Sequence, residues 1–289
     1  MIRKRISMKK LWRSVVFIIG FVMCSYPMIS GMVMKRYQEN IVTTHENTVR
    51  EVADEVLLSE ELKKAQEYNG ILYQTKGLSI EGIKDGILSE ESYNRILNIS
   101  DNGIMGSIEI PKVGVKLPVY HGTGDEVLDV GIGHVENSSF PVGGESTRAV
   151  LSGHRGLPNA KLFTRLDEME YGDLFYINVL DQMLAYKVCE ITVIKPEEQN
   201  ALEIQEGRDL VTLVTCTPYG LNTHRLLVTG ERVEYNVEEY EYAKPQIYSI
   251  RELAFSAIPF VFLAVAVIMF FSKWYKRRRK KGVDGFGKE

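Results

Sequence analysis

Two long uncharged stretches near the ends of the chain most constrain its fold. Residues 14–34 form a run of 21 residues without a charge, and residues 254–272 form a run of 19. A helix needs about 20 predominantly apolar residues to cross a bilayer. Six Lys or Arg residues precede the first run and seven lie within residues 273–281 after the second, and such basic clusters stay on the cytoplasmic side. The sequence therefore predicts two transmembrane helices, at 14–34 and 253–272, with basic cytoplasmic tails at 1–13 and 273–289.

Each span has an alternative interpretation. A cleaved signal peptide also combines a basic start with an apolar stretch, but its apolar core is only about 7 to 15 residues long, and a clean A-x-A site is missing here. A buried core helix is the alternative for the second span, and the KRRRKK run that follows it argues against burial. We therefore expect an uncleaved anchor and a two-pass membrane protein with an extracellular domain between the spans.

The portion between the spans is acidic and poor in cysteine. Residues 14–250 contain 20 basic and 35 acidic residues, a net charge of −15, which argues against nucleic acid as a partner. Of the three cysteines, Cys24 lies in the first span and Cys189 and Cys216 lie outside it. A domain stapled by disulfides would use more cysteines at regular spacing. A single bridge between Cys189 and Cys216 stays open at this point.

Residues 35–102 read as a helical segment followed by a connector. Apolar residues at helical spacing predict an external helix over 45–68, ended by Gly70. The connector contains Asp85 and a short predicted helix over 89–97, for which Ser89 is the candidate N-cap. Residues 235–252 read as a linker to the second span.

Residues 103–234 have the character of a β domain. Apolar and β-branched runs separated by turn residues predict strands and one helix, the latter at 159–169 after Pro158. Seven or eight short strands at this spacing favour a closed barrel or a sandwich. The predicted strands span residues 105–110, 115–120, 148–152, 174–179, 184–194, 210–216 and 225–233.

The segment 209–230, DLVTLVTCTPYGLNTHRLLVTG, predicts two strands joined by a short turn. Cys216 stands where the first strand ends and Arg225 where the second begins. Pro218 and Gly220 supply the turn chemistry between them. A thiol and a guanidinium are thus expected at neighbouring strand ends.

One histidine is the best candidate to act with that thiol. His154 follows a predicted strand and stands between two glycines in SGHRG, which permits close backbone approach. His224 adjoins Arg225, but successive strand residues point to opposite faces, so His224 is expected to face away from Cys216. Arg155, beside His154, is expected to be a surface or loop residue. Hydrogen-bonding or peripheral roles are expected for the remaining histidines, His45, His121 and His134.

A thiol with a histidine base is the usual arrangement for acyl transfer, because thiolate attacks carbonyls and imidazole moves the proton. Arg225 cannot hold the histidine tautomer as an Asn or Asp does, since guanidinium has five donors and no acceptor. It can donate to a substrate carbonyl or to the oxyanion formed on attack.

The motifs GIGHVENSSFPVGG, VLSGHRG, LVTCTPYG and NTHRLLVTG occur in this order, and in them the chain resembles the sortases, class C in particular. The resemblance covers about residues 103–233. It implies an eight-stranded β-barrel with short helices and a catalytic set of His154, Cys216 and Arg225, without cofactor or metal. It further implies cleavage of an LPXTG-like sorting signal between Thr and Gly, a thioester on Cys216, and transfer to a lysine of another pilin subunit. The two spans fit class C, because housekeeping sortases usually have only the first.

The sequence departs from the class C pattern in the connector. Class C sortases carry a lid with an Asp-Pro-aromatic motif, and this connector has no proline. Asp85-Gly86-Ile87 is the nearest counterpart. As a lid, Asp85 would pair with Arg225 and Ile87 would cover Cys216, with glycine holding the turn less rigidly than proline.

Other functions use the same residues differently. A housekeeping-type sortase would anchor surface proteins to cell-wall peptidoglycan instead of joining pilins. A membrane-bound thiol protease would let water resolve the thioester and would be expected to supply an Asn or Asp partner. A non-enzymatic assembly scaffold gives no reason for His, Cys and Arg at three separate strand ends.

Overall fold

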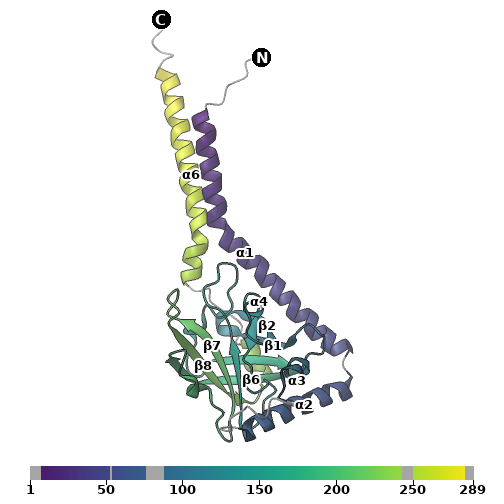
Figure 1. The fold of residues 1–289 in the computed structure, drawn as a ribbon. Coiled ribbons are helices and arrows are strands. Elements are labelled where there is room, and N and C mark those ends of the chain that lie inside the picture. Colours follow the sequence, from purple (N-terminus) through teal and green to yellow (C-terminus); the bar gives the residue numbers. More distant parts are fainter. Residues whose placement is uncertain (1–7, 53, 76–87, 243–249, 284–289) are drawn as a thin grey trace. The chain divides into compact units, whose positions relative to one another are not determined.

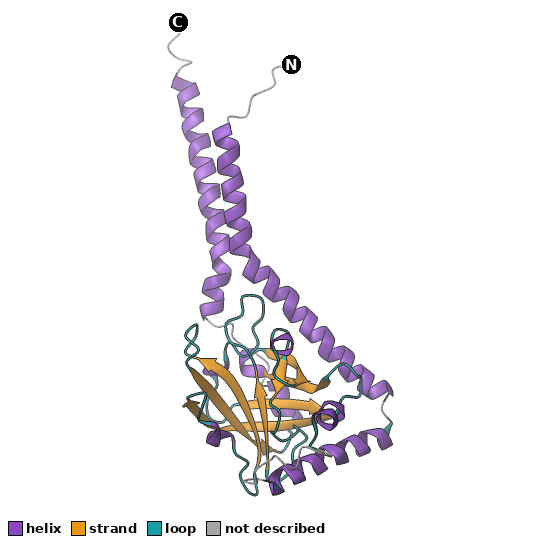
Figure 2. Cartoon of the chain, in the orientation of Figure 1, coloured by secondary structure: helices purple, strands orange, loops and turns teal. Residues whose placement is uncertain are grey.

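A computed structural model describes residues 8–52, 54–75, 88–242 and 250–283 (Figures 1 and 2). The chain divides into two units, one made of Met1–Ser30 with Ile247–Glu289 and the other of Gly31–Gln246. Each unit is described by itself below.

Two apolar helices form the first unit. Helix α1 (Met8–Val52) begins here, and α6 (Ile250–Val283) lies beside it (Figure 1). The rings of Phe17 and Phe262 stack with centroids 4.8 Å apart. Of the helices in the described ranges, the one containing Val15–Glu51 is long and apolar enough to cross a membrane, whereas α6 contains a shorter apolar part, Ala257–Lys273. The first predicted span therefore has a matching helix, and the second remains a prediction.

Three helices precede the barrel in the second unit: the later part of α1, α2 (Glu55–Gln74) and α3 (Glu90–Arg95). The predicted single helix over 45–68 is wrong, because α1 ends at Val52 and Asp54 starts a new helix. The Asp54 carboxylate accepts a hydrogen bond from the Leu57 N–H at 2.8 Å, an N-cap. Helix α2 also continues through Gly70. The short helix α3 forms where it was predicted, with Ser89 as its N-cap.

The centre of this unit is a closed barrel of strands in the order β1-β2-β3-β4-β7-β8-β6-β5 (Figure 2). This confirms the predicted eight-stranded fold. The pairs β2/β3 and β4/β7 are parallel, and the other pairs are antiparallel. The strands are β1 (Ile104–Ile110), β2 (Val115–His121), β3 (Ile132–His134), β4 (Thr147–Ser152), β5 (Leu174–Val179), β6 (Gln182–Ile194), β7 (Asp209–Thr217) and β8 (His224–Val233).

The connections between strands contain only short helical turns, which span Pro111–Val113 (η2), Asp125–Leu128 (α4), Leu166–Glu168 (η3) and Gln199–Leu202 (η4). The predicted helix over 159–169 is wrong, since only η3 forms there. Its apolar residues are buried without a helix, with Leu162 and Phe163 each 1% exposed. Strand β3 was not predicted, because three residues in a glycine-rich stretch carry no visible alternation.

The segment after the barrel folds back onto it. A short helix, α5 (Val237–Tyr242), follows β8, and the Tyr240 hydroxyl donates to Glu109 at 2.9 Å. The Tyr240 ring packs edge-on against Tyr176 with centroids 5.0 Å apart. The barrel and its exit are therefore held together by side-chain contacts on β1 and β5.

Candidate active site

The ends of β7 and β8 bring a thiol and a guanidinium face to face. The two strands are antiparallel, and Cys216 pairs directly with Arg225, one residue before Thr217 pairs with His224. Side chains of directly opposed residues lie on the same face with Cβ atoms about 5 Å apart. Both Cys216 and Arg225 are partly exposed, so the pair is open to solvent at the barrel rim.

Strand β4 brings His154 to the same rim. Its last paired residue, Ser152, is in parallel register with Val214 of β7. The Gly153 N–H donates to the Val214 carbonyl at 3.0 Å, and the Thr215 hydroxyl donates to the Gly153 carbonyl at 2.8 Å. His154 follows Ser152 by two residues, as Cys216 follows Val214, so both residues stand just beyond the paired part of the β4/β7 ladder.

Gly153 is required for this approach. A Cβ on Gly153 would lie 2.6 Å from Ile132 and 2.7 Å from the Phe163 ring, both buried core residues. The Phe163 N–H in turn donates to the His154 carbonyl at 3.1 Å. The core therefore fixes the backbone on which His154 stands.

The ring of His154 differs from the other histidine rings. Within the part of the chain that the structure describes, the His154 ring makes no hydrogen bond. The other four rings each make at least one, to Ser100 from His45, to backbone carbonyls from His121, to Tyr93 and Ser139 from His134, and to Thr223 from His224. Among the described residues, His154 is therefore the imidazole without a ring hydrogen bond, which makes it the candidate for proton transfer.

His134 shows the opposite situation. Its Nε2 faces the Ser139 carbonyl at 2.8 Å and its Nδ1 faces the Tyr93 hydroxyl at 3.0 Å. A carbonyl only accepts, so Nε2 carries the proton and Nδ1 is an acceptor. The single Tyr93 hydroxyl proton is shared between Nδ1 at 3.0 Å and the His134 carbonyl at 3.1 Å. Burial lowers the pKa of His134 to about 4, with the hydrogen bond to Ser139 opposing the shift. His134 is therefore a neutral structural residue that ties the connector to the barrel.

Among the described residues, Arg225 forms hydrogen bonds through one of its three guanidinium nitrogens. Its Nη1 donates to the carbonyls of Asn222 and His224 at 3.3 and 3.2 Å. Among the described residues no carboxylate pairs with it. Because guanidinium has five donors, Nε and Nη2, which have no partner among the described residues, can donate to a substrate oxygen.

The two cysteines outside the first span are both free thiols, so the bridge left open by the sequence does not form. Cys189 lies in β6, where its thiol donates to the Thr229 carbonyl at 3.5 Å. Burial raises the pKa of the Cys189 thiol. This residue is held within the sheet, as its place on a strand suggested.

Arg155 was expected to be a surface or loop residue, and it lies in the loop after β4, but its side chain is not at the surface. Its side chain is only 4% exposed, because it turns inward against the loop that carries Asp167. Burial of this kind depends on contacts between distant segments, so the pattern of neighbouring residues does not predict it.

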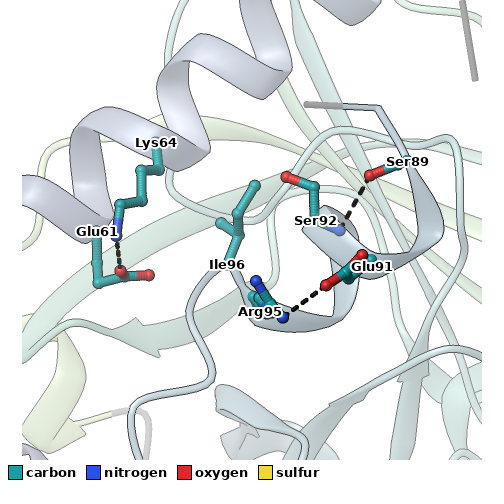
Figure 3. Close-up of a pocket in the computed structure, with 7 residues that line it drawn as sticks. All are labelled: Glu61, Lys64, Ser89, Glu91, Ser92, Arg95 and Ile96. Atoms are coloured by element: carbon teal, nitrogen blue, oxygen red, sulfur yellow. Dashed lines mark hydrogen bonds and ion pairs between the residues drawn. The ribbon is translucent and has the colours of Figure 1, made fainter. Parts of the chain in front are cut away.

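The two lid candidates, Asp85 and Ile87, lie outside the described residues. The segments that flank residues 76–87 border a polar hollow of about 370 Å³ between α2 and α3 (Figure 3). Its charges are neutralised in pairs, with Lys64 2.6 Å from Glu61 and Arg95 2.6 Å from Glu91. We assign it no catalytic role, because it contains none of the residues at the barrel rim. Nor do the described residues contain a group of three or more His, Cys, Asp or Glu side chains able to hold a metal ion.

Known proteins are similar to this chain in sequence and in fold. A model of the sortase domain matches residues 108–233. Sortase D of Bacillus subtilis is 30% identical over 131 residues, which are 44% of this chain and 63% of that protein. The match thus spans less than two thirds of that curated relative.

Solved structures match over more of the chain. Sortase C1 from Streptococcus agalactiae is 42% identical with a TM-score of 0.63, over 68% of this chain and 100% of that chain. Sortase C from Streptococcus pneumoniae is 40% identical with a TM-score of 0.59, over 68% of this chain and 97% of that chain. The chain therefore belongs to the sortase family, and its solved neighbours are class C sortases.

Proposed function

We propose that this protein is a membrane-anchored cysteine transpeptidase that polymerises pilin subunits. It cleaves an LPXTG-like sorting signal between Thr and Gly, carries the acyl fragment as a thioester on Cys216, and transfers it to a lysine of another pilin. The observation that carries the proposal is the pairing of Cys216 with Arg225 at a strand end beside the strand that leads to His154. The pilin substrate is supported by the class C neighbours, since the Streptococcus pneumoniae enzyme is described for its pilin substrate specificity.

The first half of the reaction forms the thioester. His154 takes the proton of Cys216, and the thiolate attacks the carbonyl carbon of the signal's Thr. The negative charge that develops on the carbonyl oxygen is stabilised by the N–H groups of Arg225. When the C–N bond breaks, His154 returns the proton to the departing glycine amine.

The second half reverses the roles with a new amine. The lysine amine attacks the thioester carbonyl, His154 accepts its proton, and Arg225 again stabilises the oxyanion. The C–S bond breaks, Cys216 leaves as a thiolate, and an isopeptide bond joins the two subunits. No metal or cofactor is needed, because the thiol is the nucleophile and imidazole carries the proton.

The proposal includes a location. The barrel works outside the cell, α1 and α6 both cross the membrane, and both basic tails are cytoplasmic. The uncharged spans, the basic clusters beyond them and the stacking of Phe17 on Phe262 support this arrangement. Labelling of single cysteines introduced into each tail, with a membrane-impermeant reagent on intact cells, tests it. Labelling of a tail before lysis would contradict it.

Turnover tests the chemistry. The full chain in detergent micelles is mixed with an LPXTG-type peptide, with and without a pilin subunit that carries the acceptor lysine. We expect cleavage between Thr and Gly and a covalent peptide–pilin product. Cys216→Ala should abolish both reactions, whereas Cys189→Ala, which removes the other external thiol, should leave them intact.

Each other outcome identifies a different enzyme. Transfer to a peptidoglycan amine but not to a pilin lysine would indicate a housekeeping-type sortase. Hydrolysis that is unaffected by any amine would indicate a thiol protease. Transfer that survives Cys216→Ala would contradict the proposed mechanism.

A further inference from the structure

The residues that directly follow His154 and Cys216 in the chain are joined to each other. Arg155 donates from Nη1 to the Thr217 hydroxyl at 3.2 Å. Its Nη2 donates to the Asp167 carboxylate at 2.5 Å. Its guanidinium also lies 5.9 Å from the centroid of the Tyr219 ring. One side chain therefore links the loop after β4, the end of β7 and the turn that leads to β8.

The burial of the Arg155 side chain is not explained by a gain in stability. The side chain is 4% exposed, and its Nε is buried without a hydrogen-bond partner among the described residues. Removing a charge from water is costly, and an apolar side chain of similar volume is often as stabilising as a buried ion pair. The pair with Asp167 satisfies only part of the guanidinium. A role in geometry accounts better for Arg155 than a gain in stability.

The position of this link relative to the β4/β7 ladder suggests that role. Among the described residues, the backbone hydrogen bond from Gly153 to Val214 is the last one between these segments. Beyond it, the Thr215 hydroxyl bonds the Gly153 carbonyl and Arg155 bonds Thr217. These two side-chain links lie on either side of Cys216 along β7. The relative position of the thiol and the imidazole therefore depends on them.

The turn after Arg155 is built around the same contact. Gly156 has a left-handed φ of +86°, and a Cβ there would lie 2.9 Å from the Tyr219 ring. The backbone thus passes close to Tyr219 while Arg155 approaches the same ring from its side chain. A closely packed loop of this kind has little freedom to shift once the guanidinium is in place.

We propose that Arg155 is a positioning residue, which holds the His154 loop against the Cys216 strand end through its bonds to Thr217 and Asp167. It touches neither the substrate nor the thiol in this proposal, which rests on the function proposed above. A displacement of about 1 Å at a reacting group costs on the order of 100-fold in rate. Loss of the link should therefore reduce catalysis while leaving the fold and substrate binding in place.

The main test is a double-mutant cycle that uses the full chain in detergent micelles. Arg155→Met removes the guanidinium, and Thr217→Val removes its hydroxyl acceptor at nearly constant volume. We expect each change to lower kcat by about 10- to 100-fold with KM little changed, and the double variant to be no slower than the slower single variant. Additive losses in the logarithm of kcat would overturn the link.

Arg165→Met is the matched control. Arg165 is 12% exposed, pairs with Glu168 at 2.6 Å and donates from Nη1 to the Val113 carbonyl at 3.3 Å. If Arg155 acts on the site, Arg165→Met should change the melting temperature about as much as Arg155→Met does but leave kcat unchanged. Equal losses of kcat in Arg155→Met and Arg165→Met would mean that Arg155 only stabilises the loop, and this result would overturn the proposal.

A measurement that needs no substrate tests the positioning role of Arg155 independently of the proposed function. The rate at which iodoacetamide alkylates Cys216 is measured against pH, with Cys189→Ala as the background. Arg155→Met should move the alkylation profile to higher pH, because a displaced imidazole favours the thiolate less, and Arg155→Lys should restore part of the shift. An unchanged profile would overturn the positioning role even if the LPXTG-type peptide proved to be the wrong substrate. A shifted profile together with no peptide turnover would instead overturn the proposed function alone.

Discussion

The barrel contains two places where a thiol lies near an arginine, and they differ in what the arginine already binds. Arg208 approaches the Cys189 sulfur at 3.6 Å, but it also pairs with the Glu231 carboxylate at 2.7 Å and contacts Gln205. Arg225, opposite Cys216, binds only two backbone carbonyls within the described residues. Both places therefore combine a thiol with a guanidinium. Only at Cys216 does the guanidinium have no carboxylate partner among the described residues.

Two histidines also differ in whether their polar groups already have hydrogen-bond partners. His134 is fully buried, with both ring nitrogens hydrogen-bonded. His154 stands partly exposed at the rim without a ring partner in the described part of the chain. Groups whose hydrogen bonds are complete stabilise the fold, whereas groups with unused capacity can act on a substrate. The contrast supports the catalytic roles proposed for Cys216, His154 and Arg225, and it does not depend on their order in the sequence.

Substituting each arginine in turn tests most directly whether Arg225 and Arg208 have different roles. Arg225→Ala should lower kcat by about 10²- to 10³-fold, the usual cost of one oxyanion donor. Arg208→Ala should leave kcat unchanged and lower the free energy of unfolding by about 1 kcal/mol at most, because its ion pair with Glu231 is partly exposed. Peptide turnover and melting curves measure the two effects. Similar losses of kcat in both variants would mean that the available donors of Arg225 have no special role.

A smaller effect is expected from acid. The folded pKa of His134, about 4, lies below the unfolded value of about 6.5. Above pH 6.5 both states are neutral and the stability is fully present. As the pH falls from 6.5 toward 4, the unfolded state takes up the proton first and the folded state loses up to about 3 kcal/mol.

Hydrogen exchange of the β4 amides between pH 7 and pH 4.5 measures this loss. His134→Asn should have a lower free energy of opening at pH 7 but a shallower decline with acid than the unmodified chain. Parallel declines in the two proteins would show that His134 is not the group that titrates.

The sequence predicted the parts of this fold that depend on local patterns. Strand alternation located seven of the eight strands, and turn chemistry anticipated the hairpin that opposes Cys216 and Arg225. It did not locate β3, which is too short to show alternation. The apolar residues at 159–169 resembled a helix because buried loop residues and helical residues can share the same spacing.

The sequence singled out His154 from the glycines around it, but it predicted a direct pairing only where one strand follows another in the chain. Cys216 and Arg225 belong to a single hairpin, so their pairing follows from local register. The burial of Arg155 depends on Asp167 in one loop and Thr217 in another, and neither contact can be read from neighbouring residues. Likewise, the break at Asp54 depends on a cap that competes with a continuous helical pattern.

Trapping the acyl-enzyme tests the central claim most directly. The full chain is incubated with an LPXTG-type peptide without an amine acceptor, quenched in acid, digested and analysed by mass spectrometry. We predict that the peptide fragment ending in Thr is attached, with loss of one water relative to the free acid, to Cys216 and is released by hydroxylamine. An adduct on Cys189, or turnover without any adduct on Cys216, would contradict the account.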